Sequence, residues 1–280
     1  MRTLALRTFL ALAGLTLSWT AAEAVTLKEP FELTHPLAAG GTLTLENTNG
    51  SVTLEAWDRN EVRVEAEKRV KASSDEQARE IMKRLQIEVK KDANSLSLVT
   101  KMPRKDSGLL SWLSGSSYDA GVTYRIRVPR SVTLDAGTVN GGIKLTGTRG
   151  KAELETVNGT IQIEGAQGSF DLETTNGAIQ VARTAGGVRA STTNGSIDVR
   201  LTEVAAGEDL SFATTNGSVT LQLPRNARAS VDAAATNGRV SSDFEVDGES
   251  GKHRLEGDIN GGGGRLRIRT TNGSVKLVAE

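Results

Sequence analysis

Four carboxylates fall into a pattern that could perform chemistry. Glu153 and Glu155 precede one Asn-Gly pair by five and three residues, and Asp171 and Glu173 precede the next pair by the same intervals. If the two segments lie side by side as strands, these four side chains form a tight acidic patch. Such a patch could serve as a carboxylate pair in glycoside hydrolysis or bind Ca²⁺ weakly, and a solvated outer strand surface fits the same alternation.

The composition excludes most other chemistry. The 280 residues include no Cys and only two His, which excludes thiol catalysis, disulfides, iron–sulfur clusters and zinc–thiolate sites. Basic and acidic residues number 34 each, so no excess of positive charge would attract nucleic acid. The balanced charge predicts no nucleic-acid partner. Because a solvated strand surface is the favoured interpretation of the four carboxylates, we also expect no catalytic residue, metal or cofactor.

An 18-residue repeat must position the four carboxylates. Asn-Gly pairs begin at Asn140, Asn158, Asn176 and Asn194, each 18 residues after the last, and further pairs begin at Asn216, Asn237 and Asn272. Another pair, at Asn49, lies 91 residues before the regular block. Apolar and polar residues alternate on both sides of each pair, which predicts strand–turn–strand units of roughly 18–22 residues.

Two architectures fit these units. In an antiparallel meander, Asn-Gly would form type I′ hairpin turns, because Asn and Gly tolerate positive φ angles. In a parallel β-solenoid, each unit is one rung and identical residues stack on one another. The repeated Thr two residues before Asn favours the all-β, single-domain parallel solenoid, because a hairpin turn does not require it. The predicted structural ladder consists of Thr156, Asn158, Gly159, Thr174, Asn176, Gly177, Thr192, Asn194, Gly195, Thr214, Asn216 and Gly217.

The direction of these side chains follows from their positions. The ladder threonines share parity with the preceding apolar residues and should point into the core. The same parity would turn the asparagines inward, although they could instead occupy the corners of the rungs. A second threonine column should point outward beside the asparagines. An exposed threonine column can order water only when a second threonine column lies two residues away, and the sequence has no such second column. This outward column contains Thr175, Thr193, Thr215, Thr236 and Thr271.

The first 24 residues are typical of a secretory signal peptide. A basic flank precedes a short apolar run over 9–17, and small residues up to Ala24 suit cleavage. An uncleaved anchor is the alternative. The mature domain, residues 25–280, contains no run of apolar residues long enough to span a membrane. We therefore expect an exported protein, located in the periplasm or at the cell surface.

The mature domain divides into two parts. Residues 25–130 contain an amphipathic helix at 73–85, predicted to cap the solenoid, and a loop at 103–121; residues 131–280 form the regular repeats. Apolar residues cluster in this loop, which could contact a partner or fold back over one end of the solenoid: Leu109, Leu110, Trp112 and Leu113. Because the chain ends on a predicted strand at 274–278, an exposed terminal rung could also mediate self-association.

Several of these features resemble a known family. The Thr-x-Asn-Gly units, the helix followed by a strand containing Leu96 and Leu98, and the strand from Tyr124 to Pro129 together resemble the exported bacterial β-repeat domains called "putative adhesin" or toastrack domains. The resemblance covers most of the mature chain. It implies a cell-envelope or surface protein without catalytic residues.

The expected function is that of a non-enzymatic, adhesin-like module of the envelope. Polar ladder faces suit contact with an envelope glycan or protein, neither of which the sequence identifies. The alternative is a polysaccharide-active β-helix enzyme that uses the acidic patch.

Overall fold

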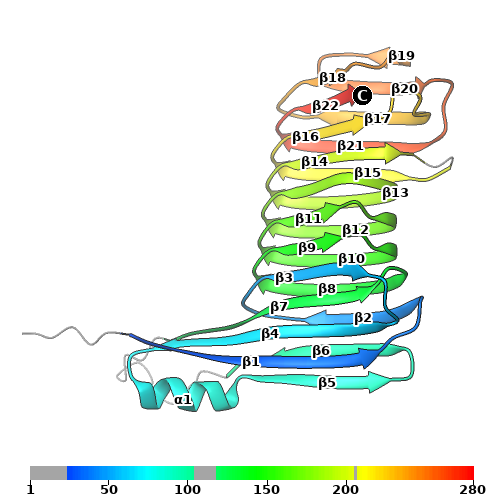
Figure 1. Cartoon of the computed structure of the whole chain (residues 1–280). Helices are drawn as coiled ribbons and strands as arrows, with labels where there is room; N and C mark the ends of the chain where they lie inside the picture. Colours follow the sequence, from blue (N-terminus) through cyan, green and yellow to red (C-terminus); the bar gives the residue numbers. More distant parts are fainter. Residues whose placement is uncertain (1–23, 104–117, 205–206) are drawn as a thin grey trace, which may run out of the picture.

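The alternating repeats form strands stacked in a column, as the computed structural model of the chain shows (Figure 1). The structure describes residues 24–103, 118–204 and 207–280. Its 22 described strands all belong to one hydrogen-bonded sheet, which folds over at the Asn-Gly corners into two layers. The described part is therefore all-β and solenoid-like, with one helix. No helix in these ranges is long and apolar enough to cross a lipid bilayer.

We call the strands that lead into the corners, with those paired alongside them, the front layer, and the remaining strands the back layer. The end of the column that carries the helix is the base, and the opposite end is the top. From base to top the front layer contains β5 (Gln86–Asp92), β6 (Ser95–Lys101), β2 (Gly41–Glu46), β8 (Val132–Asn140), β10 (Arg149–Asn158), β12 (Gln167–Asn176), β13 (Ile179–Asn194), β15 (Leu210–Asn216), β21 (Gly264–Asn272), β17 (Ala229–Ala235), β20 (Arg254–Ile259) and β19 (Asp247–Ser250). The back layer contains β1 (Val25–Pro36), β4 (Glu61–Ala72), β7 (Asp119–Pro129), β3 (Val52–Trp57), β9 (Ile143–Thr146), β11 (Ile161–Glu164), the first residues of β13, β14 (Ile197–Glu203), β16 (Val219–Leu223), β22 (Val275–Ala279) and β18 (Val240–Ser242).

Consecutive repeats stack in register. β10 pairs with β12 in parallel, so that Thr156 lies beside Thr174 and Asn158 beside Asn176. In the back layer, β11 pairs in parallel with β9 and β13. The antiparallel meander is therefore wrong for these repeats, since each one pairs with its equivalent in the same direction.

The order along the chain differs from the order in space at both ends. Near the base, β2 and β3 pair with β8 and β9, so the early Asn49 segment stacks directly on the repeat of Asn140. Near the top, β22 lies between β16 and β18. The prediction that the last strand forms an exposed terminal rung is therefore wrong, because β22 is paired along both edges.

Both ends of the column contain antiparallel strands, so a purely parallel solenoid is also wrong. At the base, β4 pairs antiparallel with β1 and β7, and β5 pairs antiparallel with β6. At the top, β20 pairs antiparallel with β17 and β19, which interrupts the regular repeats predicted for 131–280. The loop predicted at 103–121 ends before residue 121, because β7 begins at Asp119.

The helix forms where its capping residues predict it. α1 (Asp75–Arg84) begins after Ser74, whose hydroxyl accepts a hydrogen bond from the Gln77 amide at 3.2 Å. Ala78, Ile81 and Met82 are buried on one face. The helix lies at the base against β1 and β4, within two residues of the predicted 73–85 (Figure 1).

The core is a narrow layer of aliphatic side chains between the two layers. Its largest fully buried side chains include Tyr124, Phe170 and Phe212, and most others are Leu, Ile or Val. Each such side chain contributes about 1.5–3 kcal/mol when it is fully buried. The Tyr124 hydroxyl shares a hydrogen bond of 2.7 Å with Thr100, so this buried polar pair is satisfied.

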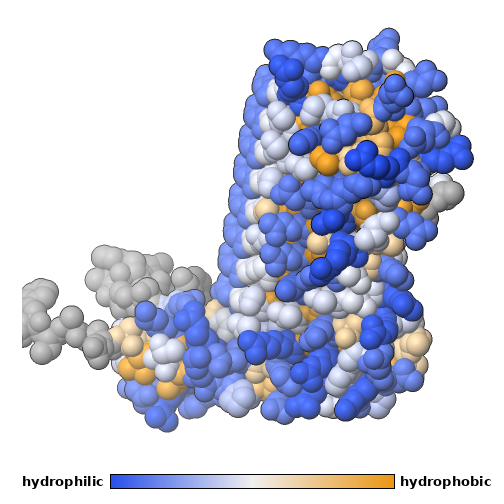
Figure 2. Space-filling model, turned by 45° about the horizontal axis from the view of Figure 1, so that its top comes forward, coloured by the Kyte–Doolittle hydropathy of each residue, from blue (hydrophilic) through white to orange (hydrophobic). Residues whose placement is uncertain are grey.

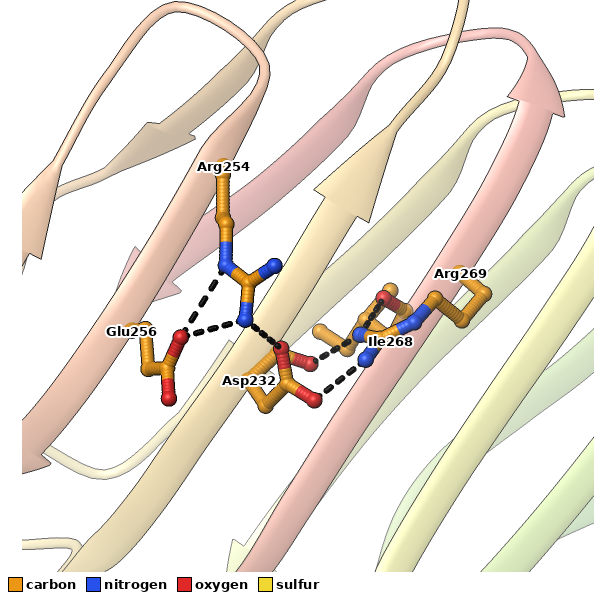
Figure 3. A network of polar contacts seen from close by, with 5 residues as sticks. All are labelled: Asp232, Arg254, Glu256, Ile268 and Arg269. Carbon is orange, nitrogen blue, oxygen red and sulfur yellow. Dashed lines mark hydrogen bonds and ion pairs between the residues drawn. The ribbon is translucent and has the colours of Figure 1, made fainter.

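A polar network ties three strands together at the top (Figure 3). Asp232 of β17 accepts a hydrogen bond from Arg269 of β21, and its carboxylate lies 3.9 Å from the Arg254 guanidinium of β20. Arg269 also donates to the Asp232 carbonyl at 2.7 Å, and Arg254 also pairs with Glu256. The Arg269 hydrogen bond lowers the pKa of Asp232 and outweighs the opposing effect of burial.

Candidate functional site

Eight asparagines form one hydrogen-bonded ladder at the Asn-Gly corners. The Nδ2 of each asparagine donates to the Oδ1 of the asparagine one rung nearer the base, at 2.8–2.9 Å. From top to base the ladder contains Asn237, Asn272, Asn216, Asn194, Asn176, Asn158, Asn140 and Asn49. At the foot, Asn49 donates to the Ala120 carbonyl at 3.0 Å. Every bridging N–H therefore points toward the base.

The ladder lies on the surface. Asn158, Asn176 and Asn194 are exposed, whereas strand parity would have turned them inward. The chain bends at the asparagine and so leaves the alternation of the strand. Each amide within the ladder uses one N–H and one oxygen lone pair, which leaves a second N–H and a second lone pair for solvent or a ligand.

The threonines two residues earlier are buried and hold neighbouring rungs together. Thr174 is 2% exposed, and its hydroxyl donates to the Gly159 carbonyl of the rung below at 3.0 Å. Thr156, Thr192, Thr214 and Thr270 make the equivalent bond. In the Asn49 repeat this position holds Asn47, whose amide donates to two backbone carbonyls. The spacing Asn47-x-Asn49-Gly50 could have revealed this substitution within the repeat.

The corner glycines are required by close approach of the rungs. A Cβ added to Gly159, Gly177, Gly195 or Gly217 would lie 1.9–2.0 Å from the carbonyl oxygen of the glycine one rung below. None of the eight ladder asparagines has a positive φ angle. The corners are therefore not type I′ turns. That turn occurs at Asn260–Gly261, where both residues have positive φ.

A column of side chains, exposed in every rung except the lowest, lies beside the asparagine ladder. The residue before each asparagine points outward, and in the upper rungs it is threonine. From base to top the column contains Thr48, Val139, Val157, Thr175, Thr193, Thr215, Thr271 and Thr236. Val139 and Val157, at 40% and 37% exposed, are the large apolar side chains that the described residues leave exposed, on a surface that is mostly hydrophilic (Figure 2).

Two grooves flank the foot of the ladder. On the back side, a groove of about 460 Å³ is lined by polar residues that include Asn49, Asn140, Arg69, Asp119 and Thr123. Arg69 and Asp119 form an ion pair at 2.6 Å there. On the front side, a groove of about 250 Å³ is lined by Glu46, Asn47, Gly137, Thr138, Val139, Glu155 and Val157. The sequence did not single out Arg69 or Asp119, because β4 and β7 bring them together from positions 50 residues apart.

The acidic patch forms as the spacing predicts. Glu153 lies beside Asp171 and Glu155 beside Glu173, and all four are exposed on the front layer. Glu153 pairs with Lys151 at 3.6 Å. Within the described ranges, no group of three or more His, Asp or Glu residues is placed to hold a metal ion. The geometry is that of a solvated strand surface, with Glu155 also lining the front groove.

Two predicted features lie outside the described residues. They are the signal peptide, of which only Ala24 is described, and the apolar cluster of Leu109, Leu110, Trp112 and Leu113.

Comparisons with solved structures find similar chains of bacterial origin. A "putative cell adhesion protein" from Clostridium sporogenes is 13% identical, with a TM-score of 0.34 over 90% of this chain and 100% of its own. A "putative adhesin" from Bacteroides fragilis is 11% identical, with a TM-score of 0.38 over 89% of this chain and 97% of its own. A "putative lipid binding protein" from Parabacteroides distasonis is 12% identical, with a TM-score of 0.30 over 88% of this chain and 96% of its own. No curated protein sequence matches the chain significantly.

The sequence itself identifies the family. The family described as Toastrack DUF4097 matches residues 41–278, which include every rung of the column and the antiparallel strands at its top. The chain therefore belongs to the Toastrack DUF4097 family.

Proposed function

We propose that the protein is an exported, non-enzymatic module of the cell envelope that binds an extended polar polymer, an envelope glycan, along the asparagine corner. The observation that carries this proposal is the continuity of the ladder. Seven exposed amides, stacked rung on rung, lead to the half-buried Asn49 at a foot flanked by two grooves. A periodic row of donors and acceptors matches a repeating polymer better than a single small ligand.

The chemistry of the foot supports a hydroxyl-rich ligand. Asparagine amides, the Arg69–Asp119 pair and Thr123 offer donors and acceptors to hydroxyl groups, while exposed Val139 and Val157 offer apolar contact. Among the residues that the structure describes, no Trp or Phe lines either groove. Binding of each sugar unit should therefore be weak, and affinity should come from many units bound along the corner.

Co-sedimentation with insoluble envelope glycans tests the proposal. The mature chain, residues 25–280, should be retained without release of reducing ends. The variant Thr175→Arg/Thr215→Arg places two long cations on the corner and should weaken retention at least about tenfold, a loss of about 1.4 kcal/mol. The matched control Gln180→Arg/Thr220→Arg makes the same charge change on the back layer of the same two rungs and should bind like the unmodified chain.

The outcome also separates the two alternatives. Equal retention of both double variants would contradict binding at the corner. Retention by envelope proteins but not by glycans would assign the corner a protein partner. Release of reducing ends would contradict a non-enzymatic role, and its loss on changing Glu153, Glu155, Asp171 and Glu173 to Gln would place the activity in the acidic patch.

A further inference from the structure

The Asn-Gly pairs of this chain could undergo deamidation. The backbone nitrogen of glycine can attack the side-chain Cγ of the preceding asparagine, because glycine has no side chain to shield it and rotates freely. A Cγ–N bond forms, the Cγ–Nδ2 bond breaks, and the amide leaves as ammonia with the proton of the glycine N–H. Water then opens the cyclic imide to aspartate or isoaspartate. The reaction requires a free glycine N–H and a side chain able to turn toward it.

Six of the eight ladder pairs lack both conditions. The glycine N–H of each donates to the carbonyl of the asparagine in a neighbouring rung, at 2.8–3.1 Å: Gly50, Gly141, Gly159, Gly177, Gly195 and Gly217. The side chain of each of these asparagines also donates one ladder bond and accepts another. Attack at these positions requires that a rung first opens.

The pair at the top of the ladder is different. Asn237 donates to Asn272 at 2.9 Å, but within the described residues no donor reaches its Oδ1. In the same part of the chain, the Gly238 N–H has no hydrogen-bond acceptor. Asn237 is also exposed, so water reaches its side chain. Both requirements of the reaction are therefore nearly met at this position.

Two other pairs are intermediate. The Gly273 N–H also lacks an acceptor among the described residues, but Asn272 both donates to Asn216 and accepts from Asn237. At the Asn260–Gly261 turn, the Asn260 amide donates to two backbone carbonyls at 2.7 and 3.0 Å, and both bonds must break before the side chain can turn. Each of these two asparagines has one more side-chain hydrogen bond than Asn237.

We propose that Asn237 is the deamidation site of the folded protein, and that the ladder protects the pairs beneath it. The inference does not depend on the proposed function. Deamidation converts a donor at the end of the ladder into a carboxylate, which removes the bond to Asn272 and adds a negative charge at the top of the corner. Modified Asn237 should therefore accumulate as the folded protein ages.

Trypsin separates the relevant pairs, which permits a direct test. Cleavage after Lys and Arg yields peptides 190–200, 229–239, 255–265 and 270–276, each with a single Asn-Gly pair at Asn194, Asn237, Asn260 or Asn272. The folded mature chain is incubated in mildly alkaline buffer, and conversion of each peptide is followed by mass spectrometry. Peptide 229–239 should convert first, at least about tenfold faster than peptide 190–200, a ratio that corresponds to about 1.4 kcal/mol.

Two controls keep the test decisive. In concentrated urea the four peptides should convert at similar rates, because the same dipeptide has then lost its protection. The variant Asn237→Gln should remove the early conversion and leave peptides 190–200 and 255–265 converting as in the unmodified chain, whereas Asn272, which then loses the bond from Asn237, should convert faster. Equal rates for Asn194 and Asn237 in the folded chain, or earlier conversion of Asn260 or Asn272, would overturn the proposal.

Discussion

Neighbouring threonines in one strand have opposite environments. The Thr174 hydroxyl is buried and bonds to the Gly159 carbonyl, whereas Thr175 is exposed beside the ladder. Thr174→Val keeps the shape but removes the donor, and should lower the free energy of unfolding by about 1–2 kcal/mol because a partly buried carbonyl loses its partner. Thr175→Val should change it by less than about 0.5 kcal/mol. Urea unfolding of both variants measures the difference, and equal values would contradict the role of the buried threonines.

The sequence predicts these residues to different degrees. The buried threonines follow from parity with Leu154 and Leu172, because both positions lie within the strand. The asparagines do not follow from parity, because the corner rotates the backbone at that point. Arg69 and Asp119 carry no local signal, since only the pairing of β4 with β7 brings them together.

At the scale of elements, the corner depends on the distance between rungs. A Cβ on Gly177 would lie 1.9 Å from the Gly159 oxygen, whereas a Cβ on Gly137 would meet no atom closer than 4.0 Å. Gly177→Ala should therefore cost about 3 kcal/mol or more, because two backbones must separate. Gly137→Ala, in β8, should be neutral or stabilising by up to about 1 kcal/mol. Chemical denaturation compares them, and a tolerated Gly177→Ala would show that the corner can widen.

The network that joins β17, β20 and β21 should make the top of the column sensitive to acid. Because Arg269 lowers the pKa of Asp232, the folded state binds this proton less readily than the unfolded state. The resulting stability is present above the ordinary carboxyl pKa of about 4 and is lost as the pH falls through the lowered value. Asp232→Asn should therefore lower Tm at neutral pH, and the difference from the unmodified chain should vanish in acid. Exposed Asp135→Asn is the control, and a difference independent of pH would argue against the charge as the cause.

The elements were predictable wherever the signal is local. Capping residues and apolar spacing place α1 within two residues of its bounds, and the repeat places the strands of the regular block. The stacking order was not predictable at the ends. There, asparagines that bond to each other are 91, 35 and 56 residues apart in the sequence, and spacing along the chain does not show which rungs lie next to each other.

At the scale of the whole molecule, the base presents a strand edge that must not recruit another chain. β1 is 12 residues long and, in the described structure, pairs along one edge only, with β4. Pro30 stands near its middle, and Glu29, which is exposed but on the same strand face as the half-buried Leu27 and Phe31, pairs with Lys68 at 2.8 Å. A proline and a charge on the apolar face of an edge strand oppose strand addition.

These two residues should keep the protein monomeric. Sedimentation of residues 25–280 should show one species across a wide range of concentration, whereas Glu29→Val/Pro30→Thr should associate as the concentration rises, because the edge then offers an additional N–H and an apolar face. Glu67→Val is the matched control, since it adds the same apolar side chain to β4, a strand paired along both edges. Association of the unmodified chain would instead show that the β1 edge pairs with another copy despite Pro30 and Glu29.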